Sequence, residues 1–266
     1  MIGSRRVGSL CDPTGQCWLG GPLSRTAVVA LMAAAVVASP PRTHAQAAAG
    51  GQPPGARVSA PIDLTGYWVS FVTEDWRYRM VTPPRGDYGR VPVTREALRI
   101  LNAWNPAADG AAGEACKSYG AASLMRVPGR FRITWQDDNT LRIDSDAGMQ
   151  TRLFRFGSVP VGRVGMSGAR TWQGTSVARW DARSLAVETR NMRAGYLRKN
   201  GVPYSESATL TEYFDVAPHP GGSQLLVVTA IVVDPQYLEL PYIVSTNFKK
   251  EADGSGWDPT PCSTTW

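Results

Sequence analysis

The chain has 266 residues, of which 43% are hydrophobic, and its 28 basic and 22 acidic side chains give a formal net charge of +6. Residues 1–47 hold four of the arginines and one aspartate, so the rest of the chain carries a net charge of only +3. That remainder contains no run of basic residues, which argues against a nucleic-acid partner. Its length suits one domain with a sizeable hydrophobic core.

The N-terminal segment has the pattern of a secretory signal peptide. Arg25 precedes an uncharged run at residues 26–38, and an A-x-A cleavage signal ends at Ala47. The run is shorter than the ~20 apolar residues that span a bilayer. We therefore predict a signal peptide at 1–47, a periplasmic or secreted mature protein, and no stable membrane anchor after cleavage. The Arg5-Arg6 pair leaves the twin-arginine route open, but it lies far from the apolar run, which favours an upstream start codon or an unusually long leader.

The rest of the chain is expected to form a flexible Gly/Pro-rich lead-in at 48–61 and a single domain at 62–266. Only Cys116 and Cys262 remain after cleavage. An even number of cysteines in an oxidising compartment predicts one disulfide between them. A loop of that length would stabilise the fold by up to ~5 kcal/mol in the loop-entropy model.

Most of the domain alternates apolar and polar residues with period two between short turns, which predicts an antiparallel sheet in a sandwich or barrel. The expected strands, in chain order, are 67–71, 76–80, 131–135, 141–143, 149–156, 172–180, 185–190, 208–214, 224–234 and 242–249. One accessory helix is expected from Thr94 to Trp104, because its apolar residues recur at helical spacing. The segments 107–115 and 157–168 are expected to be loops.

The run 224–234 differs from the other strands because neither of its faces is polar. Such a run predicts a strand that is covered on both sides or lies near the centre of the core.

Several chemistries find no support in the sequence. His219 is the one histidine after the leader, and it lies between two prolines. A zinc site needs three or four His, Cys or carboxylate ligands, and no nucleotide-binding motif is present. We therefore predict no metal site and no cofactor.

Glu212 is the best catalytic candidate. In the strand 208–214 it shares a face with Leu210 and Phe214, so its carboxylate is expected on the apolar side. Burial raises the pKa of a carboxyl group, which suits general acid or base catalysis. The alternative is a buried structural pair between Glu212 and an arginine, and it is slightly favoured.

Arg152 is the matching candidate for a ligand clamp. It shares a face with Phe154 and Phe156, and an arginine in an apolar interior suits a ligand carboxylate or a glutamate partner. A solvated side chain is an equal alternative.

Two further segments contain candidate ligand-binding residues. Trp76 and Arg77 lie in a run where acidic, aromatic and basic residues alternate. The connection 195–204 has the composition of a binding lip, although a plain exposed loop is an open alternative. From this connection we predict Tyr196 and Lys199 as groups that stabilise developing negative charge, with Arg198 and Tyr204 as ligand contacts. Trp172 is added as an aromatic surface for stacking.

Residues 63–68, Asp-Leu-Thr-Gly-Tyr-Trp, resemble the G-x-W opening of lipocalin-like, or calycin, barrels, where the tryptophan packs at the barrel base. The wider chain, residues 62–262, resembles a large group of exported soil-bacterial proteins of unassigned function. The segments that carry this second resemblance are 172–181, 185–189, 210–214 and 233–237. The resemblances imply export and a barrel-like β fold, and they assign no catalytic residue.

Together these observations predict an all-β, antiparallel, calycin-like barrel that holds a small aromatic or anionic organic molecule. If it is an enzyme, we expect metal-free, cofactor-independent acid–base chemistry: elimination, isomerisation or cyclisation by a lyase or isomerase. The alternatives are a non-catalytic carrier of a hydrophobic ligand and an envelope interaction protein. A polar cavity would favour the enzyme, an apolar one the carrier, and a filled barrel with an exposed apolar patch the interaction protein.

Overall fold

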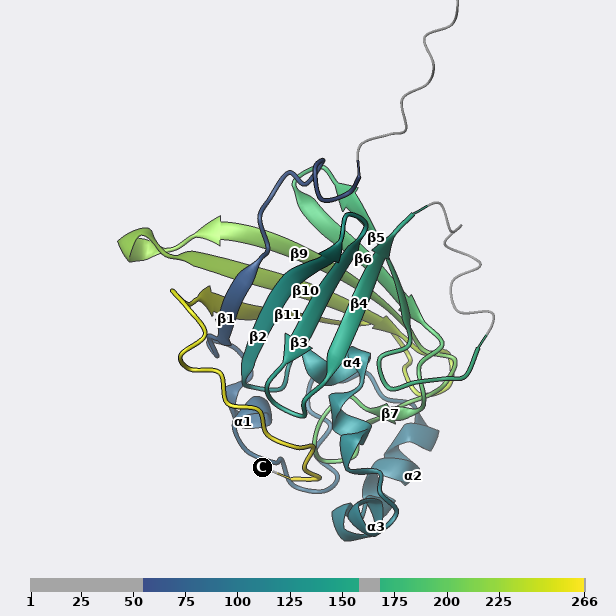
Figure 1. The fold of residues 1–266 in the computed structure, drawn as a ribbon. Coiled ribbons are helices and arrows are strands. Elements are labelled where there is room, and N and C mark those ends of the chain that lie inside the picture. Colours follow the sequence, from purple (N-terminus) through teal and green to yellow (C-terminus); the bar gives the residue numbers. More distant parts are fainter. Residues whose placement is uncertain (1–54, 158–167, 266) are drawn as a thin grey trace, which may run out of the picture. The chain divides into compact units, whose positions relative to one another are not determined.

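The computed structural model describes residues 55–157 and 168–265, which form a mostly-β domain around a closed barrel (Figure 1). Nine strands close the barrel in the order β1-β11-β10-β9-β6-β5-β4-β3-β2. They are β1 (Gly66–Ser70), β2 (Arg130–Asp137), β3 (Thr140–Ser145), β4 (Thr151–Phe156), β5 (Thr175–Asp181), β6 (Ser184–Arg190), β9 (Thr209–Pro218), β10 (Gln224–Val233) and β11 (Tyr242–Lys250). The predicted β-barrel is confirmed, whereas the predicted signal peptide at 1–47 and most of the expected loop 157–168 lie outside the described residues.

The prediction of a wholly antiparallel barrel is wrong at one junction. Strands β4 and β5 pair in parallel, with Phe154 opposite Ser176, while the other neighbouring strands of the barrel pair antiparallel. Strand direction can alternate all the way round a closed ring only when the number of strands is even. Nine strands therefore require a parallel pair, and the connection 157–174 is long enough for the crossover that such a pair needs.

The interior of the barrel is filled with large apolar side chains. Alternate residues of each strand point inward, and eight large inward-facing side chains are at most 1% exposed: Trp68, Phe131, Ile133, Leu141, Ile143, Phe154, Phe214 and Phe248. The rings of Phe154 and Phe214 meet edge to face at 5.4 Å, and those of Phe131 and Phe248 at 5.1 Å. Such packing gives this part of the barrel a solid core rather than the hollow of a ligand-binding barrel.

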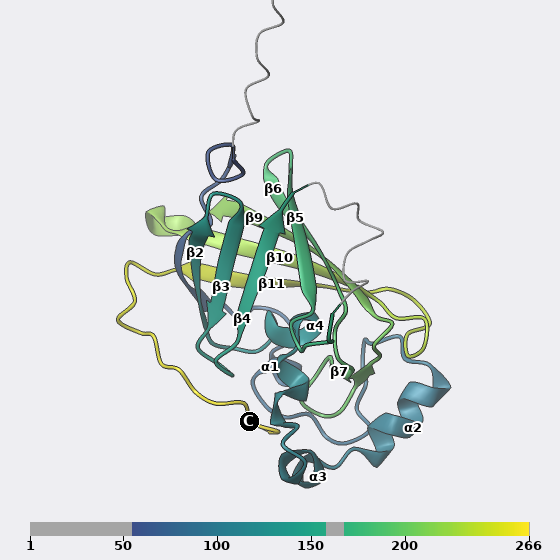
Figure 2. The same cartoon turned by 45° about the vertical axis from the view of Figure 1, so that its right-hand side comes forward.

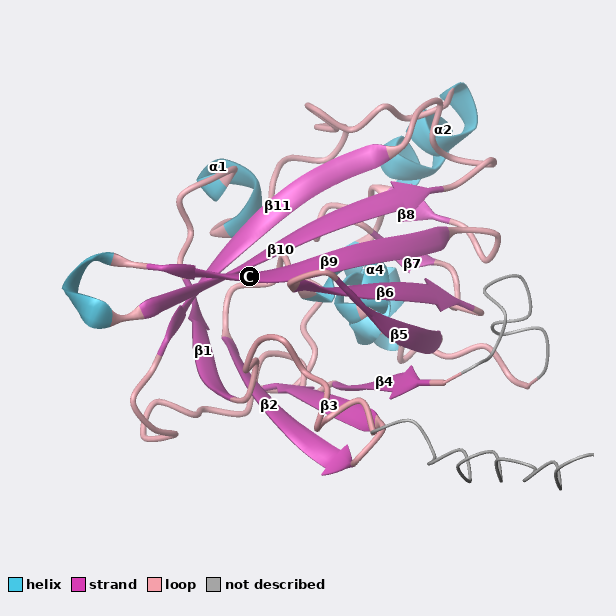
Figure 3. Cartoon of the chain, turned by 90° about the horizontal axis from the view of Figure 1, so that it is seen from above, coloured by secondary structure: helices cyan, strands magenta, loops and turns pink. Residues whose placement is uncertain are grey.

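The long connections gather at one end of the barrel, with the short helices beneath it (Figures 1 and 2). They contain the helices α1 (Trp76–Arg79), α2 (Arg95–Ala103), α3 (Pro106–Ala111), η1 (Ala115–Tyr119) and α4 (Ala121–Leu124), and the paired strands β7 (Gly195–Tyr196) and β8 (Pro203–Tyr204). Seen from above, α4 appears within the outline of the ring of strands (Figure 3). We call this side the helical end of the barrel.

Three local predictions are corrected at the helical end. The expected strand 76–80 is the helix α1, and the expected loop 107–115 contains α3 and the start of η1. The helix after Thr94 is present as α2, and the Thr94 hydroxyl accepts a hydrogen bond from Ala97 N at 3.3 Å. It is one of several short helices rather than the only one.

Strand β10 is buried on one face only, so the first of the two predicted alternatives, a strand covered on both sides, is wrong. Its inward residues Leu226, Val228 and Val232 are at most 1% exposed, whereas its outward residues are half-buried and Val233 is 44% exposed. Valine and isoleucine have high β-propensity and also occur on the outer, partly exposed face of a strand. An apolar run therefore does not by itself show that both faces of the strand are covered.

The C-terminal segment returns along the outside of the barrel to the helical end (Figure 1). There a disulfide joins Cys262 to Cys116 in η1, as predicted. Such a bond indicates an oxidising compartment. No helix within the described ranges has both the length and the apolar character needed to cross a bilayer.

Candidate functional site

Four buried cations surround a small cavity at the helical end. Arg79, Arg126, Arg198 and Lys199 are each at most 6% exposed, and all four line a cavity of about 20 Å³. We call these four residues the cation cluster. The remaining lining residues are Tyr78, Ser118, Ser123, Val127 and Leu197. Because lysine and arginine are almost never fully buried unless they are paired, such a cluster calls for a counter-charge.

The helix α1 buries Arg79 and exposes its neighbour Arg77. Residues two apart on a helix point to nearly opposite sides, whereas on a strand they share a face. The predicted strand therefore put Arg77 and Arg79 together, and the helix separates them. Asp75 precedes the helix in the left-handed region, with φ of 48°, which turns the chain so that Arg79 points beneath the barrel.

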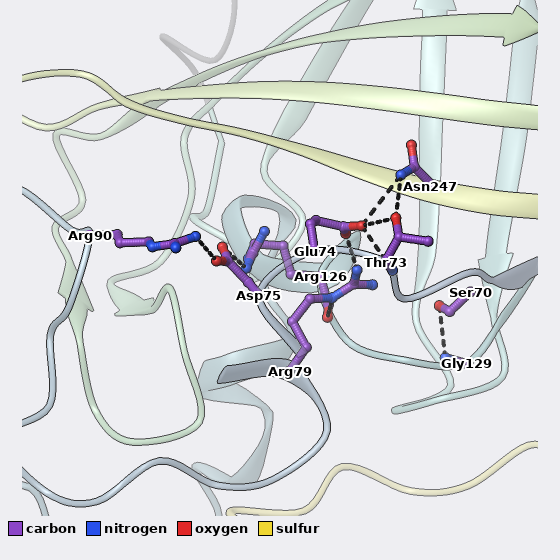
Figure 4. A network of polar contacts seen from close by, with 9 residues as sticks. All are labelled: Ser70, Thr73, Glu74, Asp75, Arg79, Arg90, Arg126, Gly129 and Asn247. Atoms are coloured by element: carbon purple, nitrogen blue, oxygen red, sulfur yellow. Dashed lines mark hydrogen bonds and ion pairs between the residues drawn. The ribbon is translucent and has the colours of Figure 1, made fainter. Parts of the chain in front are cut away.

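Glu74 holds one side of Arg79. The Arg79 guanidinium forms an ion pair with the Glu74 carboxylate, and its Nε donates to the carbonyl oxygen of Arg126 at 3.0 Å. The second oxygen of Glu74 accepts from Thr73 Oγ1 at 2.9 Å and from Asn247 Nδ2 at 3.3 Å (Figure 4). Burial lowers the pKa of Arg79 to about 10, although Glu74 opposes this shift.

Asp75 holds Arg126. Its Oδ2 accepts from Arg126 Nη2 at 3.0 Å, and its Oδ1 accepts from Arg90 Nη1 at 2.7 Å (Figure 4). Because Arg90 is largely exposed, Asp75 divides its negative charge between the cluster and the surface. It therefore neutralises less than one full charge inside.

The other two cations come from the tight connection between β7 and β8. Leu197 N donates to Val202 O at 2.7 Å, which closes this connection around Arg198 and Lys199. Gly201 has φ of +84°, and a Cβ there would lie 2.3 Å from the Trp104 ring, so this turn needs glycine. Residues 197–204 are buried, and neither the exposed lip nor the exposed loop expected here is present.

Arg198 is the least satisfied member of the cation cluster. Its guanidinium lies over the Tyr78 ring at 4.2 Å, yet Nε, Nη1 and Nη2 have no hydrogen-bond acceptor. Arg79 Nη2 and Arg126 Nη1 also lack acceptors. A buried charged donor without an acceptor is strongly unfavourable. The residues that the structure describes therefore supply no acceptor for these five nitrogen atoms.

Lys199 is linked through Tyr119 to the disulfide-bound tail. Its Nζ donates to the Tyr119 hydroxyl at 2.5 Å, and the same oxygen accepts from the backbone N of Ser263 at 3.2 Å. Ser263 follows Cys262, and Tyr119 ends the helix η1 that carries Cys116. Burial lowers the pKa of Lys199 to about 8 and raises the pKa of Tyr119.

A second ionic pair lies inside the barrel, away from the residues that line the cavity. Arg152 and Glu212 form a two-pronged pair, with Nη1–Oε1 at 2.9 Å and Nη2–Oε2 at 2.6 Å. Both side chains are at most 1% exposed. Thr189 Oγ1 also accepts from Arg152, and Ser176 hydrogen-bonds to Thr189. Both residues face the interior, as strand parity predicted, and the geometry is that of the structural Glu–Arg pair.

The other predicted site residues are dispersed. Tyr196 is half-buried and donates to Asp109 Oδ2 at 2.9 Å, and burial, with Asp109, raises its pKa. Tyr204 is fully buried, and burial raises its pKa. Trp172 is half-buried beneath the guanidinium of Arg193, 4.0 Å from its ring centre. Trp76 and Arg77 are exposed on α1. Of the predicted residues, the structure brings only Arg198 and Lys199 to the cavity.

Sequence reasoning missed Arg79 and Arg126 as site residues. Arg126 stands in the otherwise uncharged run 121–127, and a lone arginine in such a run was a usable signal. Arg79 was hidden by the incorrect strand.

Within the described part of the chain, no group of three or more His, Cys, Asp and Glu side chains is placed to hold a metal ion. Comparison of the chain with protein-family models, with curated proteins and with solved structures gives no match. The functional conclusion therefore depends on the geometry of the site.

Proposed function

We propose that this protein binds a small organic anion whose charged head group enters the cation cluster. The observation that carries the proposal is Arg198, a guanidinium only 4% exposed whose three nitrogens lack acceptors at the edge of a cavity. An anion there would accept from Arg198 and from the unpaired nitrogens of Arg79 and Arg126. Planar guanidinium groups suit oxyanions because they present paired donors.

The cavity has room for about one oxygen atom of the head group. A volume of about 20 Å³ is little more than one water needs. Val127, Leu197 and the Tyr78 ring line the same cavity, and they provide apolar surface against the first atoms of the ligand body. The rest of the molecule must lie outside.

Binding without catalysis is the simpler form of this proposal, since Glu212 is neutralised by Arg152 and does not line the cavity. One observation favours an enzyme instead. Lys199, with a pKa lowered to about 8 and a tyrosine hydroxyl at 2.5 Å, lines the anion cavity. A lysine with a pKa near the working pH can transfer protons, so metal-free acid–base catalysis by Lys199 and Tyr119 is the second candidate.

The compartment and the finer fold class belong to the same proposal. The leader pattern and the disulfide support a periplasmic or secreted protein. A calycin-like origin is supported by Trp68, which is fully buried and donates from Nε1 to Leu64 O at 2.8 Å, beneath Lys250 Nζ at 4.9 Å. The parallel β4–β5 pair departs from the antiparallel barrel expected of that class.

The test is calorimetric titration of the oxidised protein with benzoate, phenyl phosphate and benzyl alcohol, which share a ring and differ in charge. Wild type should bind an anion and not the alcohol. Arg198→Met should weaken anion binding at least tenfold, because charge-assisted hydrogen bonds contribute about 1.5–3 kcal/mol each. Arg179→Met, on the exposed outer face of β5, is the matched control and should bind like wild type.

Two results would contradict the proposal: wild-type protein that binds neither anion, or Arg198→Met that binds them as tightly as wild type. Thermal melting of each variant verifies that it is folded. Arg198→Lys keeps the charge and loses most of the donors. If Arg198 contacts the ligand directly, the anion affinity of this variant should lie between that of wild type and that of Arg198→Met.

A further inference from the structure

We propose that the cavity at the helical end binds a chloride ion, which competes there with the head group of the organic anion. This inference rests on the proposed anion site and concerns the regulation of that site by a second ligand. It follows from the size of the cavity and from the guanidinium nitrogens around it that lack acceptors among the described residues.

The size of the cavity selects a ligand, or a part of one, that is a single atom. A volume of about 20 Å³ holds little more than one water molecule. Chloride is a sphere not much larger than a water molecule, so the whole ion can enter. An organic anion can place only one oxygen atom in the same volume, and the two ligands therefore exclude each other.

Arg79 and Arg126 each keep one terminal nitrogen without an acceptor. Arg79 directs Nη1 to Glu74 and Nε to the carbonyl oxygen of Arg126, which leaves its Nη2. Arg126 directs Nη2 to Asp75, which leaves its Nη1. The two carboxylates thus hold both guanidinium groups in place (Figure 4), and each group retains a donor for a ligand.

Arg198 adds donors from the β7–β8 connection. Its guanidinium lies over the Tyr78 ring at 4.2 Å, a contact that attracts the charge and supplies no oxygen acceptor. Its Nε, Nη1 and Nη2 lack acceptors among the described residues. A chloride ion only accepts hydrogen bonds and can take several at once, whereas a water molecule in the same place would need acceptors for its own two hydrogens.

The arginines around the cavity also repel one another. Burial lowers the pKa of Arg79 to about 10, and the charge of Arg126 adds to this fall, although Glu74 opposes it. A chloride ion in the cavity would offset this repulsion and supply an acceptor. Lys199 is already hydrogen-bonded to Tyr119, so the inference uses the three arginines alone.

The direct test is the line width of chloride in NMR spectra of the oxidised protein. A bound chloride ion tumbles with the protein and broadens the signal of the free ion with which it exchanges. Wild type should broaden the line, and Arg198→Met should lose more than half of that broadening. Arg179→Met, on the exposed outer face of β5, should broaden the line as wild type does. If Arg198→Met matches wild type, the chloride inference is wrong.

Competition connects the chloride ion to the organic anion. In calorimetry the affinity for benzoate should fall about tenfold when chloride is present at about ten times its own dissociation constant. Sodium iodide at the same concentration screens surface charges equally. The iodide ion is larger, so it should lower the affinity clearly less, whereas at an exposed cationic surface the weakly hydrated iodide would compete at least as well as chloride.

The outcomes separate this inference from the proposed function. If chloride binds through Arg198 and no organic anion does, the chloride site stands and the proposed function fails. If organic anions bind through Arg198 and the two salts lower their affinity equally, the chloride inference is wrong and the organic-anion site survives. If neither chloride nor an organic anion binds, both proposals fail.

Discussion

The ion pair inside the barrel should be structural, and Glu212→Gln tests this directly. The substitution keeps the shape of the side chain and removes its charge, which leaves the Arg152 guanidinium without a counter-charge in the core. Both side chains are at most 1% exposed and are joined by two hydrogen bonds. Breaking a buried pair of this kind by changing one partner typically costs ~3–5 kcal/mol.

That loss should be visible as a large drop in melting temperature. In a domain of this size each 1 kcal/mol shifts Tm by about 2–4 °C, so Glu212→Gln should lower Tm by roughly 6–20 °C in calorimetry. Urea unfolding should give the same loss of free energy with an unchanged m-value. Glu206→Gln is the control: Glu206 forms a pair with Arg170 at the surface, and exposed pairs contribute about 0–1 kcal/mol.

The double variant Arg152→Met with Glu212→Leu separates charge from packing. Replacing both partners of a buried pair with apolar residues of similar size is often neutral or stabilising, so the double variant should recover most of the stability that Glu212→Gln loses. A Glu212→Gln protein as stable as wild type that has lost ligand turnover would refute this reasoning and restore Glu212 as a general acid or base.

Three further predictions concern the helical end. In ligand-free buffer, Arg198→Met should raise the free energy of unfolding by about 1–3 kcal/mol, because it removes a buried charge without acceptors; destabilisation in urea would argue against that interpretation. Replacing both Cys116 and Cys262 with serine should lower the free energy of unfolding by about 2–5 kcal/mol. Thiol titration of the denatured, unreduced wild-type protein should find neither cysteine free. The Lys199 amine has its pKa lowered to about 8 in the fold, so between pH 8 and 10 the unfolded state binds more protons and stability should rise with pH. Lys199→Met should lack this rise, and parallel curves for variant and wild type would contradict the prediction.

The sequence predicted the barrel and its inward faces correctly where the period-two pattern was long. In β9 and β4, Glu212 and Arg152 share faces with phenylalanines over several residues, and one parity error would reverse every side chain. Both were therefore placed inside before the pairing of the strands was known. The sequence left open what each would meet, because β4 and β9 are not neighbours in the barrel and no local pattern connects them.

The helix α1 was mistaken for a strand because it is one turn long. In the run 76–79, tryptophan, tyrosine and two arginines alternate, and four residues cannot distinguish a period of two from one of 3.6. Its start depends on the left-handed backbone of Asp75, which is held by Arg90 and Arg126 from distant parts of the chain. Tertiary contacts, which no local pattern expresses, decide the structure of this segment.

The cation cluster could be predicted only in part for the same reason. Arg198 and Lys199 were singled out because their segment combined cations with tyrosines, glycine and proline. Arg79 and Arg126 lie 47 residues apart, and they come from different helical segments. Only the topology, which directs the long connections to one end of the barrel, brings the three segments around one cavity.

The two buried ionic systems of this protein differ in a way that indicates their roles. Arg152 and Glu212 form a nearly closed system, because one positive charge meets one negative charge through two hydrogen bonds and only Arg152 Nε lacks an acceptor. The cation cluster is more open, because five guanidinium nitrogens of its arginines lack acceptors among the described residues. A buried charge with its partner contributes to a defined fold, whereas one without a partner destabilises the fold, and such unfavourable arrangements concentrate at functional sites. A bound anion would supply acceptors to these nitrogens, and the stabilisation of the folded state by ligand would then increase with ligand concentration.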